Sequence, residues 1–340
     1  MCLLVLLSLL GSPCLAAVRL DETVQPRVDA AIFKGLAFLA KQQNSDGSID
    51  GGAPKVATTS LALLAFLSAG HTPDLGRYGL VLRSQLEFLQ SKQAEDGYFG
   101  NGDRGMYSHA ITTLALAEAY GVESSATRRS RLHSTLTKAV SIILAAQDAA
   151  KSNPAFVGGW RYERNSSDSD LSLSGWNILA LRAARDVGID VPEPNRKKAG
   201  EFVLRCLDAG TKGFAYQPGS GAQAGDTAIG LMCLHLTDTA GPNATLAGGA
   251  LKFLQTHPID ADSPFSYYAT YYVTLAASEQ DGDGWLAVQR ASLERLVRTQ
   301  EKDGSWPLPK NSQEPGRVYA TAMAVGALAL PYRLLPVHQR

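Results

Sequence analysis

The sequence has no excess of charge of either sign. Lys and Arg together number 32, Asp and Glu together also number 32, and no basic stripe stands out along the 340 residues. Binding to nucleic acid depends on clustered positive charge, so we predict no nucleic-acid partner. Charged residues make up 19% of the chain against 45% hydrophobic residues, a balance that is typical of a globular protein with a large core.

Cysteine is scarce, and no two cysteines have the Cys-x-x-Cys spacing of a metal site. The sequence also lacks a Gly-rich phosphate loop of the Walker kind and a Gly-x-Ser-x-Gly elbow. We therefore predict no metal and no cofactor. Cys206 and Cys233 flank one predicted hairpin loop, and the sequence leaves both a pair of buried thiols and a disulfide open.

The chain begins with an apolar stretch from Leu3 to Leu10, followed by small residues at Ala16 and Ala17. This pattern indicates a secretory signal peptide over residues 1–17, although no Lys or Arg precedes the apolar run. The run is too short to span a bilayer comfortably. We expect a secreted or periplasmic protein, with retention at the membrane without spanning it as the alternative, and a single domain over residues 18–340.

A pattern of two helices recurs about six times with a period of roughly 50 residues. Each copy has a first helix that ends near a Gln, then a Gly and a polar loop, then a second helix rich in Ala, Leu and Thr. The second helices begin near Ala57, Tyr107, Asp170, Gly225, Ser266 and Val318.

The two helices of each copy differ in character. In the sixth copy Leu293, Leu296 and Val297 share one stripe, whereas Glu294 and Arg298 face away. The second helices are apolar nearly all round, so they must be buried on every side. The sequence therefore predicts an outer layer of amphipathic helices around an inner layer of apolar ones. Closure into a ring lets the first and last copies cover each other, because an open solenoid needs polar caps.

The stretch Gln300–Trp306 resembles the Gln-Trp repeat of squalene and oxidosqualene cyclases, with weaker echoes at Gln43–Ser48 and Gln93–Tyr98. The number of helical hairpins and the length of the repeat are also similar to those of the protein prenyltransferase β-subunits. The chain looks closest to a planctomycete-like bacterial group of prenyltransferase/squalene oxidase repeat proteins. Other stretches that carry the likeness begin at Met106, Gly158, Asp170, Phe214, Tyr267 and Gly316. The resemblance implies an all-α, closed (α/α)6 toroid, but no particular reaction, since one fold hosts many functions.

The resemblance also implies that the N-terminal ends of the inner helices line the active cavity. Class II terpene cyclases carry an Asp-x-Asp-Asp-Thr motif whose central Asp protonates an alkene or epoxide. Here Asp168 and Asp170 match its first two acidic positions, but Leu171 stands at the third. Asp170 is therefore a candidate catalytic acid, with Asp168 beside it at the substrate. The alternative is that Asp170 or Ser172 caps its helix.

Two further polar residues stand at the starts of inner helices. Asp226 is a candidate general acid or base, or a helix cap. His109 enters an apolar helix, where it serves as acid or base or is bonded to a backbone carbonyl. The zinc site of the prenyltransferase β-subunits has no counterpart in this sequence. The stretch Ser266–Tyr272 resembles their His-bearing helix but has Tyr268 and no His, and no Cys stands beside Asp226.

Aromatic residues gather at the repeat loops and at the starts of the inner helices. Their ring faces either stabilise cations or stack on a ligand, or they wedge neighbouring repeats together. As residues that contact a substrate we predict Tyr107, Trp176, Tyr268, Tyr271 and Tyr319, besides Asp168.

Three functions stay open at this point. The first is an enzyme or binder that takes an isoprenoid or other apolar molecule in the central cavity, with acid catalysis by Asp170, Asp226 or His109. The second is a non-catalytic toroid that binds a protein or peptide at its rim. The third is a carbohydrate-active enzyme on an α/α ring, which requires two opposed carboxylates in an open groove.

Overall fold

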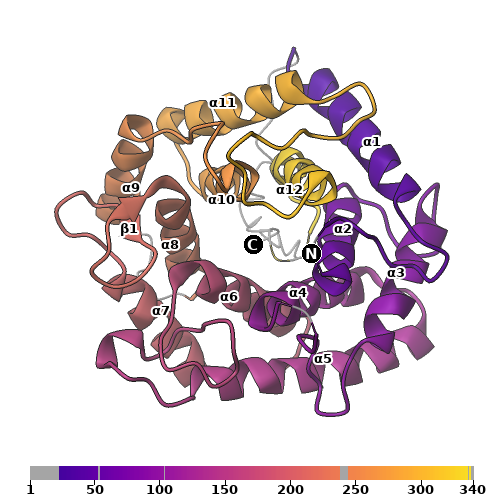
Figure 1. The fold of residues 1–340 in the computed structure, drawn as a ribbon, viewed down its shortest axis with the longest axis horizontal. Coiled ribbons are helices and arrows are strands. Elements are labelled where there is room, and N and C mark those ends of the chain that lie inside the picture. The colour runs from indigo at the N-terminus through magenta and orange to yellow at the C-terminus, as the bar shows by residue number, and fades with distance from the viewer. Residues whose placement is uncertain (1–22, 53, 103, 238–243, 336, 338–340) are drawn as a thin grey trace, which may run out of the picture.

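The computed structural model describes residues 23–52, 54–102, 104–237, 244–335 and 337. The predicted signal peptide lies outside these residues. Twelve α-helices are found among the described residues, and they form two concentric rings (Figure 1), which confirms the predicted all-α toroid. None of these helices is long and apolar enough to cross a membrane.

The inner ring consists of the six apolar helices, and its first and last members contact each other, so the ring is closed. The inner helices are α2 (Lys55–Ser68), α4 (Met106–Val122), α6 (Leu171–Asp186), α8 (Ala224–Leu236), α10 (Ser266–Ser278) and α12 (Arg317–Ala329). In α2 every residue after Lys55 is buried. A helix of this kind is stable only when neighbours surround it, which is why these sequences occupy the centre.

The outer ring consists of the amphipathic helices. They are α1 (Gln25–Lys41), α3 (Gly79–Ser91), α5 (Ala126–Gln147), α7 (Glu193–Arg205), α9 (Ala244–Thr256) and α11 (Asp283–Thr299). Two short 3₁₀ helices, η1 (Pro154–Phe156) and η2 (Leu330–Tyr332), and a two-stranded antiparallel hairpin of β1 (Phe214–Ala215) and β2 (Ala222–Gln223) complete the elements. Cys206 and Cys233 are buried free thiols.

Repeated glutamines join neighbouring repeats. Gln300 Nε2 donates to Gly304 O of its own loop at 3.0 Å and to Ala31 O of α1 at 2.8 Å. Gln43, Gln93 and Gln147 make the equivalent bonds to Val81, Thr135 and Asn195 of the next outer helix, each at 2.9 Å. The contact between the last and first repeats thus has the same chemistry as these three contacts between consecutive repeats.

The residues that follow α12 cover one end of the inner ring. Arg333 donates to Ser278 O at the end of α10, and Leu334 lies next to Gly70, just beyond α2. Leu335 and Val337 are buried. These described residues therefore pack at the end where the inner helices finish.

Candidate functional site

A cavity of about 600 Å³ lies where the inner helices begin, and all six of them contribute to its wall. This size is within the range of roughly 300–1,000 Å³ that is common for small-molecule sites. The cavity-lining residues from the inner helices are Ala57, Thr58, Leu61, Tyr107, Ile111, Ser172, Trp176, Ala224, Gly225, Asp226, Tyr268, Ala269 and Tyr319. All of them lie in the first two turns of their helices, as the resemblance implied.

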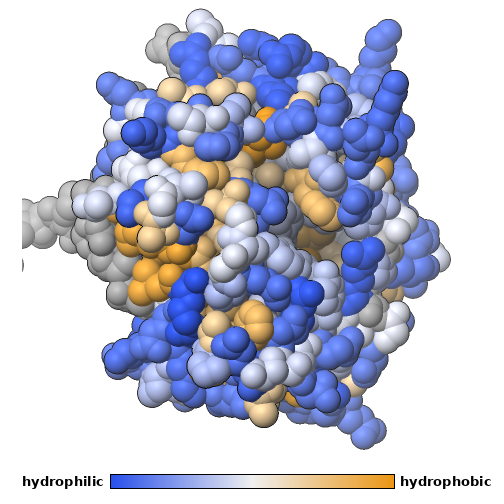
Figure 2. Space-filling view, turned by 60° about the vertical axis from the view of Figure 1, so that its left-hand side comes forward, coloured by the Kyte–Doolittle hydropathy of each residue, from blue (hydrophilic) through white to orange (hydrophobic). Residues whose placement is uncertain are grey.

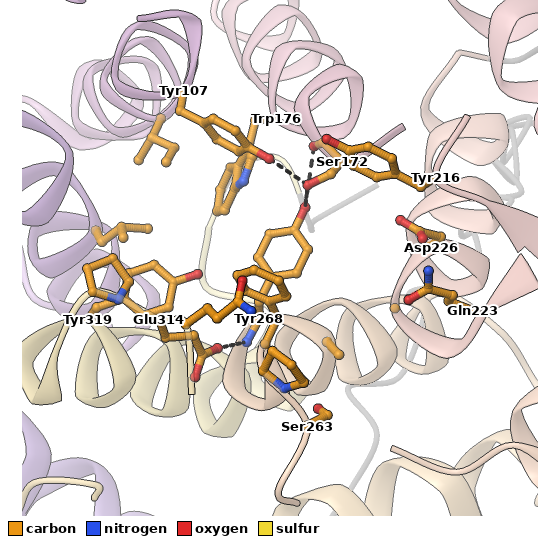
Figure 3. A pocket seen from close by; sticks show the side chains of 18 of the residues that line it. Tyr107, Ser172, Trp176, Tyr216, Gln223, Asp226, Ser263, Tyr268, Glu314 and Tyr319 are labelled. Carbon is orange, nitrogen blue, oxygen red and sulfur yellow. Dashed lines mark hydrogen bonds between the residues drawn. The ribbon is translucent and has the colours of Figure 1, made fainter. Parts of the chain in front are cut away.

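A chain of three hydroxyl groups fixes one side of the wall (Figure 3). The Oγ of Ser172 lies 2.7 Å from the hydroxyl of Tyr107 and 2.6 Å from the hydroxyl of Tyr268. These residues come from α4, α6 and α10, so the hydrogen bonds hold three inner helices at fixed separations. Tyr107 and Tyr268 were predicted from the sequence as substrate contacts, and both line the cavity.

The indole of Trp176 also lines the cavity and rests on further aromatic rings. Tyr271 stacks on it at 6.1 Å between centroids with an interplanar angle of 12°, and Tyr272 meets it edge-on at 5.6 Å. Tyr271 is not among the described residues that line the cavity, so the structure places this predicted substrate contact behind Trp176. Its role there is to support the wall.

Asp226 stands in the first turn of α8 and lines the cavity, yet it does not cap the helix. Its side chain has no hydrogen-bond partner among the described residues, and only 8% of the residue is exposed. Burial raises the pKa of Asp226 to about 7, and the nearby charge of Asp170 adds to this shift. At neutral pH this carboxyl group therefore retains much of the proton that an ordinary Asp has lost.

Glu314 is a second carboxyl group in the cavity wall, and sequence reasoning missed it. It lies in the loop between α11 and α12, and its Oε1 accepts a hydrogen bond from the Tyr268 amide at 2.8 Å. Its Oε2 is buried and has no partner among the described residues. Burial raises the pKa of Glu314 to about 7, against the opposing effect of the backbone amides. The one available signal was its place three residues before the start of the inner helix α12.

The structure places Asp170 and Asp168 outside the described cavity wall. Asp170 caps α6, with Oδ1 accepting from the Leu173 amide at 2.7 Å and Oδ2 accepting from Arg161 at 2.6 Å. Asp168 pairs with the same guanidinium at 3.2 Å. Arg161 also donates to the hydroxyl of Tyr216, a cavity residue, at 2.6 Å. Both oxygens of the fully buried Asp170 are thus occupied by the fold.

His109 is also engaged on both sides of its ring. Nδ1 accepts from the Phe99 amide at 3.2 Å, and Nε2 lies 3.0 Å from Ala139 O on α5. Burial lowers the pKa of His109 to about 4. In other repeats Thr59, Ser174, Thr227 and Thr321 accept the corresponding loop amide. His109 therefore occupies a position that elsewhere joins the hairpin loop to the inner helix, and it does not reach the described cavity wall.

Within the described residues no three His, Cys, Asp or Glu side chains gather as metal ligands would. The carboxyl groups in the cavity wall are Asp226, Asp260 and Glu314, and Arg104 is the single Lys or Arg among its described residues. The wall is otherwise aromatic and aliphatic with a few polar groups. Such a surface suits a mainly apolar ligand that offers one or two polar atoms.

No family model and no curated relative matches the sequence. Among solved structures, an inactive variant of the α-1,6-mannanase GH76A of Salegentibacter sp. HEL1_6 in complex with α-1,6-mannotriose is similar at 11% identity. This match covers 90% of this chain and 99% of that chain, with a TM-score of 0.66.

The type II terpene cyclase MstE of Scytonema is also similar. A variant in complex with its product merosterolic acid A matches at 14% identity over 91% of this chain and 98% of that chain, with a TM-score of 0.60. A variant in complex with its substrate geranylgeranyl dihydroxybenzoate matches at 14% identity over 93% and 100%, also with a TM-score of 0.60. At these identities the similarity establishes the α/α-toroid fold and no more.

Proposed function

We propose that this protein binds an isoprenoid or another apolar small molecule in its central cavity, and that Asp226 acts on it as an acid–base group. The observation that supports this proposal is a cavity lined by aromatic rings, into which a buried carboxyl group projects with no hydrogen-bond partner among the described residues. MstE, which shares the fold, carries a geranylgeranyl substrate in its own structure.

The environment of Asp226 indicates which chemistry it can perform. A carboxyl group with a pKa near 7 is a weaker acid than an ordinary Asp, and no cation or donor activates it among the described residues. It is poorly suited to protonating an isolated alkene. It is well suited to exchanging a proton with an oxygen or an activated carbon of a ligand near neutral pH, because general acid–base catalysis is most effective when the pKa lies near the operating pH.

Binding can be tested through Trp176, because it is the one tryptophan among the described cavity residues and the chain contains four. We expect geranylgeraniol to quench the tryptophan emission of the purified protein with saturation. The Trp176→Phe variant should lose most of this change, whereas Trp285→Phe, altered on the outer helix α11, should keep it. No saturable change in the wild-type protein, together with no lipid released from protein isolated from its own host, would contradict the proposal.

The acid–base role of Asp226 needs its own variant. If a reaction of a bound isoprenoid is found, Asp226→Asn should lower its rate by about a hundredfold or more, the usual contribution of general acid–base catalysis. Ligand affinity should change little. Equal rates for the variant and the wild-type protein would remove the acid–base role and leave the binding proposal in place.

A carbohydrate-active enzyme is the second candidate, because Asp226 and Glu314 place two raised-pKa carboxyl groups in one cavity. The mainly apolar wall is less favourable to a sugar than to an isoprenoid. Release of reducing ends from α-1,6-linked mannose oligosaccharides, lost in both Asp226→Asn and Glu314→Gln, would establish this candidate and displace the first.

A protein partner at the rim remains a further candidate. Phe265 and Tyr162 are cavity residues that are also partly exposed to solvent, at 50% and 40%. Figure 2 shows hydrophobic atoms in separate patches among hydrophilic ones rather than in one broad surface. From the leader pattern of residues 1–17 we also propose export from the cytoplasm. A measured protein mass that corresponds to a mature chain beginning near Ala17 or Val18 would support this proposal.

A further inference from the structure

Glu314 and Asp226 occupy different environments although both carboxyl groups project into one cavity. Oε1 of Glu314 accepts a hydrogen bond from the amide of Tyr268, in the first turn of α10, at 2.8 Å. Backbone amides and the N-terminus of a helix favour the ionised form of a carboxyl group. Asp226 receives no such bond from the described residues. The Tyr268 amide therefore stabilises an ionised Glu314 beside a bound cation, whereas an ionised Asp226 would have no such donor among the described residues.

The second oxygen of Glu314 needs a partner that the described protein residues do not supply. Glu314 is 6% exposed, and its Oε2 is buried without a hydrogen bond. A buried acceptor without a donor costs about 1–3 kcal/mol, and more when it is charged. The guanidinium whose charge reaches Glu314 is that of Arg295 on α11, but it donates to the hydroxyl of Thr270 on α10.

The surroundings of this oxygen favour a cation over an anion. Figure 3 shows Glu314 beside Tyr319 and Tyr268, whose side chains line the cavity with it. The faces of aromatic rings attract cations. Three carboxyl groups and one guanidinium line the described wall, which disfavours a phosphate or diphosphate head group.

We propose that Glu314, with the rings of Tyr268 and Tyr319, binds a positively charged nitrogen on the apolar ligand, so that the ligand of this cavity is a lipophilic amine. The ammonium group donates to Oε2 of the ionised Glu314, while the apolar chain lies along Trp176 toward Asp226. This inference rests on the proposed function, because it assumes that an apolar ligand occupies the cavity. It adds the charge of the ligand's polar end and the residue that recognises it.

A chain-matched series tests the proposal on the full-length protein. Farnesylamine, farnesol and farnesyl diphosphate share one apolar chain and differ in the charge of the head group. We expect farnesylamine to bind at least about tenfold more tightly than farnesol, because a charge-assisted hydrogen bond is roughly twice as strong as a neutral one. Farnesyl diphosphate should bind more weakly than farnesol.

Glu314→Gln keeps the shape of the side chain and an oxygen that can accept from the Tyr268 amide, but it cannot ionise. It should remove the preference for farnesylamine, while the affinity for farnesol changes by less than about threefold. Asp226→Asn, the matched carboxyl variant in the same cavity, should keep the preference. Circular dichroism and thermal unfolding are the controls that test whether both variants are folded.

The outcomes separate this inference from the proposed function. Equal binding of farnesol and farnesylamine to the wild-type protein overturns the amine proposal and leaves the apolar cavity function standing. A preference for the amine that survives Glu314→Gln also overturns it, because the amine then binds elsewhere. Failure of all three ligands to bind contradicts the proposed function itself.

Discussion

The protonation state of Asp226 predicts a distinctive pH dependence of stability that requires no ligand. The pKa of Asp226 is raised by burial from 3.8 to about 7. Between these values the unfolded chain has lost the proton that the folded protein retains. The folded state is therefore destabilised as the pH rises from about 4 to 7, since the unfolded state binds fewer protons in that window.

The magnitude follows from the shift. The difference of 7 − 3.8 is about 3.2 pKa units, and each unit corresponds to 1.36 kcal/mol, so the effect approaches about 4 kcal/mol above pH 7. Asn cannot ionise. The free energy of unfolding of Asp226→Asn relative to the wild-type protein should therefore rise by up to about 4 kcal/mol between pH 4 and pH 8.

Urea titrations of both proteins at several pH values measure this difference. Other buried carboxyl groups, such as Glu118 and Glu314, are present in both proteins, so their contributions cancel. Asp208→Asn is a matched control of opposite sign, because hydrogen bonds from Thr211 lower the pKa of the partly exposed Asp208. Its stabilising contribution is present above the unfolded pKa and is lost as the pH falls. If Asp226→Asn differs from the wild-type protein by the same amount at pH 4 and pH 8, Asp226 is not held neutral by the fold.

Two further predictions concern the scaffold. Gly304→Ala should destabilise the protein by about 1–3 kcal/mol more than Gly188→Ala, as measured by urea unfolding. Both glycines have φ near +90°, so the backbone strain is the same in the two variants. Only at Gly304 would the added Cβ also approach a neighbouring atom, Lys34 O, at 2.3 Å. Equal losses would show that the approach of α1 to this loop does not constrain the ring. His109→Thr should lower the free energy of unfolding by about 1–3 kcal/mol, because the variant loses the contact with Ala139 O and leaves a small void. Its ligand affinity should change by less than about twofold. A loss of binding in a folded variant would instead show that His109 belongs to the site.

The architecture could be predicted from the sequence because it depends on average properties of whole helices. A helix that is apolar on every side, such as α2, has to be surrounded by other helices. Helices that are apolar on one side only, such as α1, therefore form the layer outside it. An error at any single residue leaves this conclusion unchanged. The general location of the cavity, at the N-terminal ends of the inner helices, was instead implied by the family resemblance.

The individual roles were harder to predict, because they depend on where each helix begins. Asp170 and Asp226 both open an inner helix, yet Asp170 is the residue before its helix and Asp226 is the third residue within it. Each residue along a helix is rotated by about 100° from the one before it. This rotation directs the carboxyl group of Asp170 toward the backbone amides of α6 and that of Asp226 into the cavity. Helix boundaries read from sequence are uncertain by one or two residues, which is enough to exchange these roles.

Glu314 escaped prediction for a different reason. It lies on a loop, where no periodicity indicates which way a side chain points, and its partner Tyr268 is 46 residues away. His109 looked like a titratable group at the rim, but its counterparts in other repeats are Thr and Ser. Aligning the repeats by their loop amides would have shown that this position is structural.

The hydrogen bond of Gln300 to Ala31 joins residues that are 269 positions apart, whereas the other three glutamine joints span 38 to 48 positions. Contacts between distant residues carry the largest loop-closure entropy and tend to form late. During folding the first five repeats can stack one upon another, but they make only an open arc. Because the cavity wall draws on all six inner helices, the binding site comes into being only when this last joint closes.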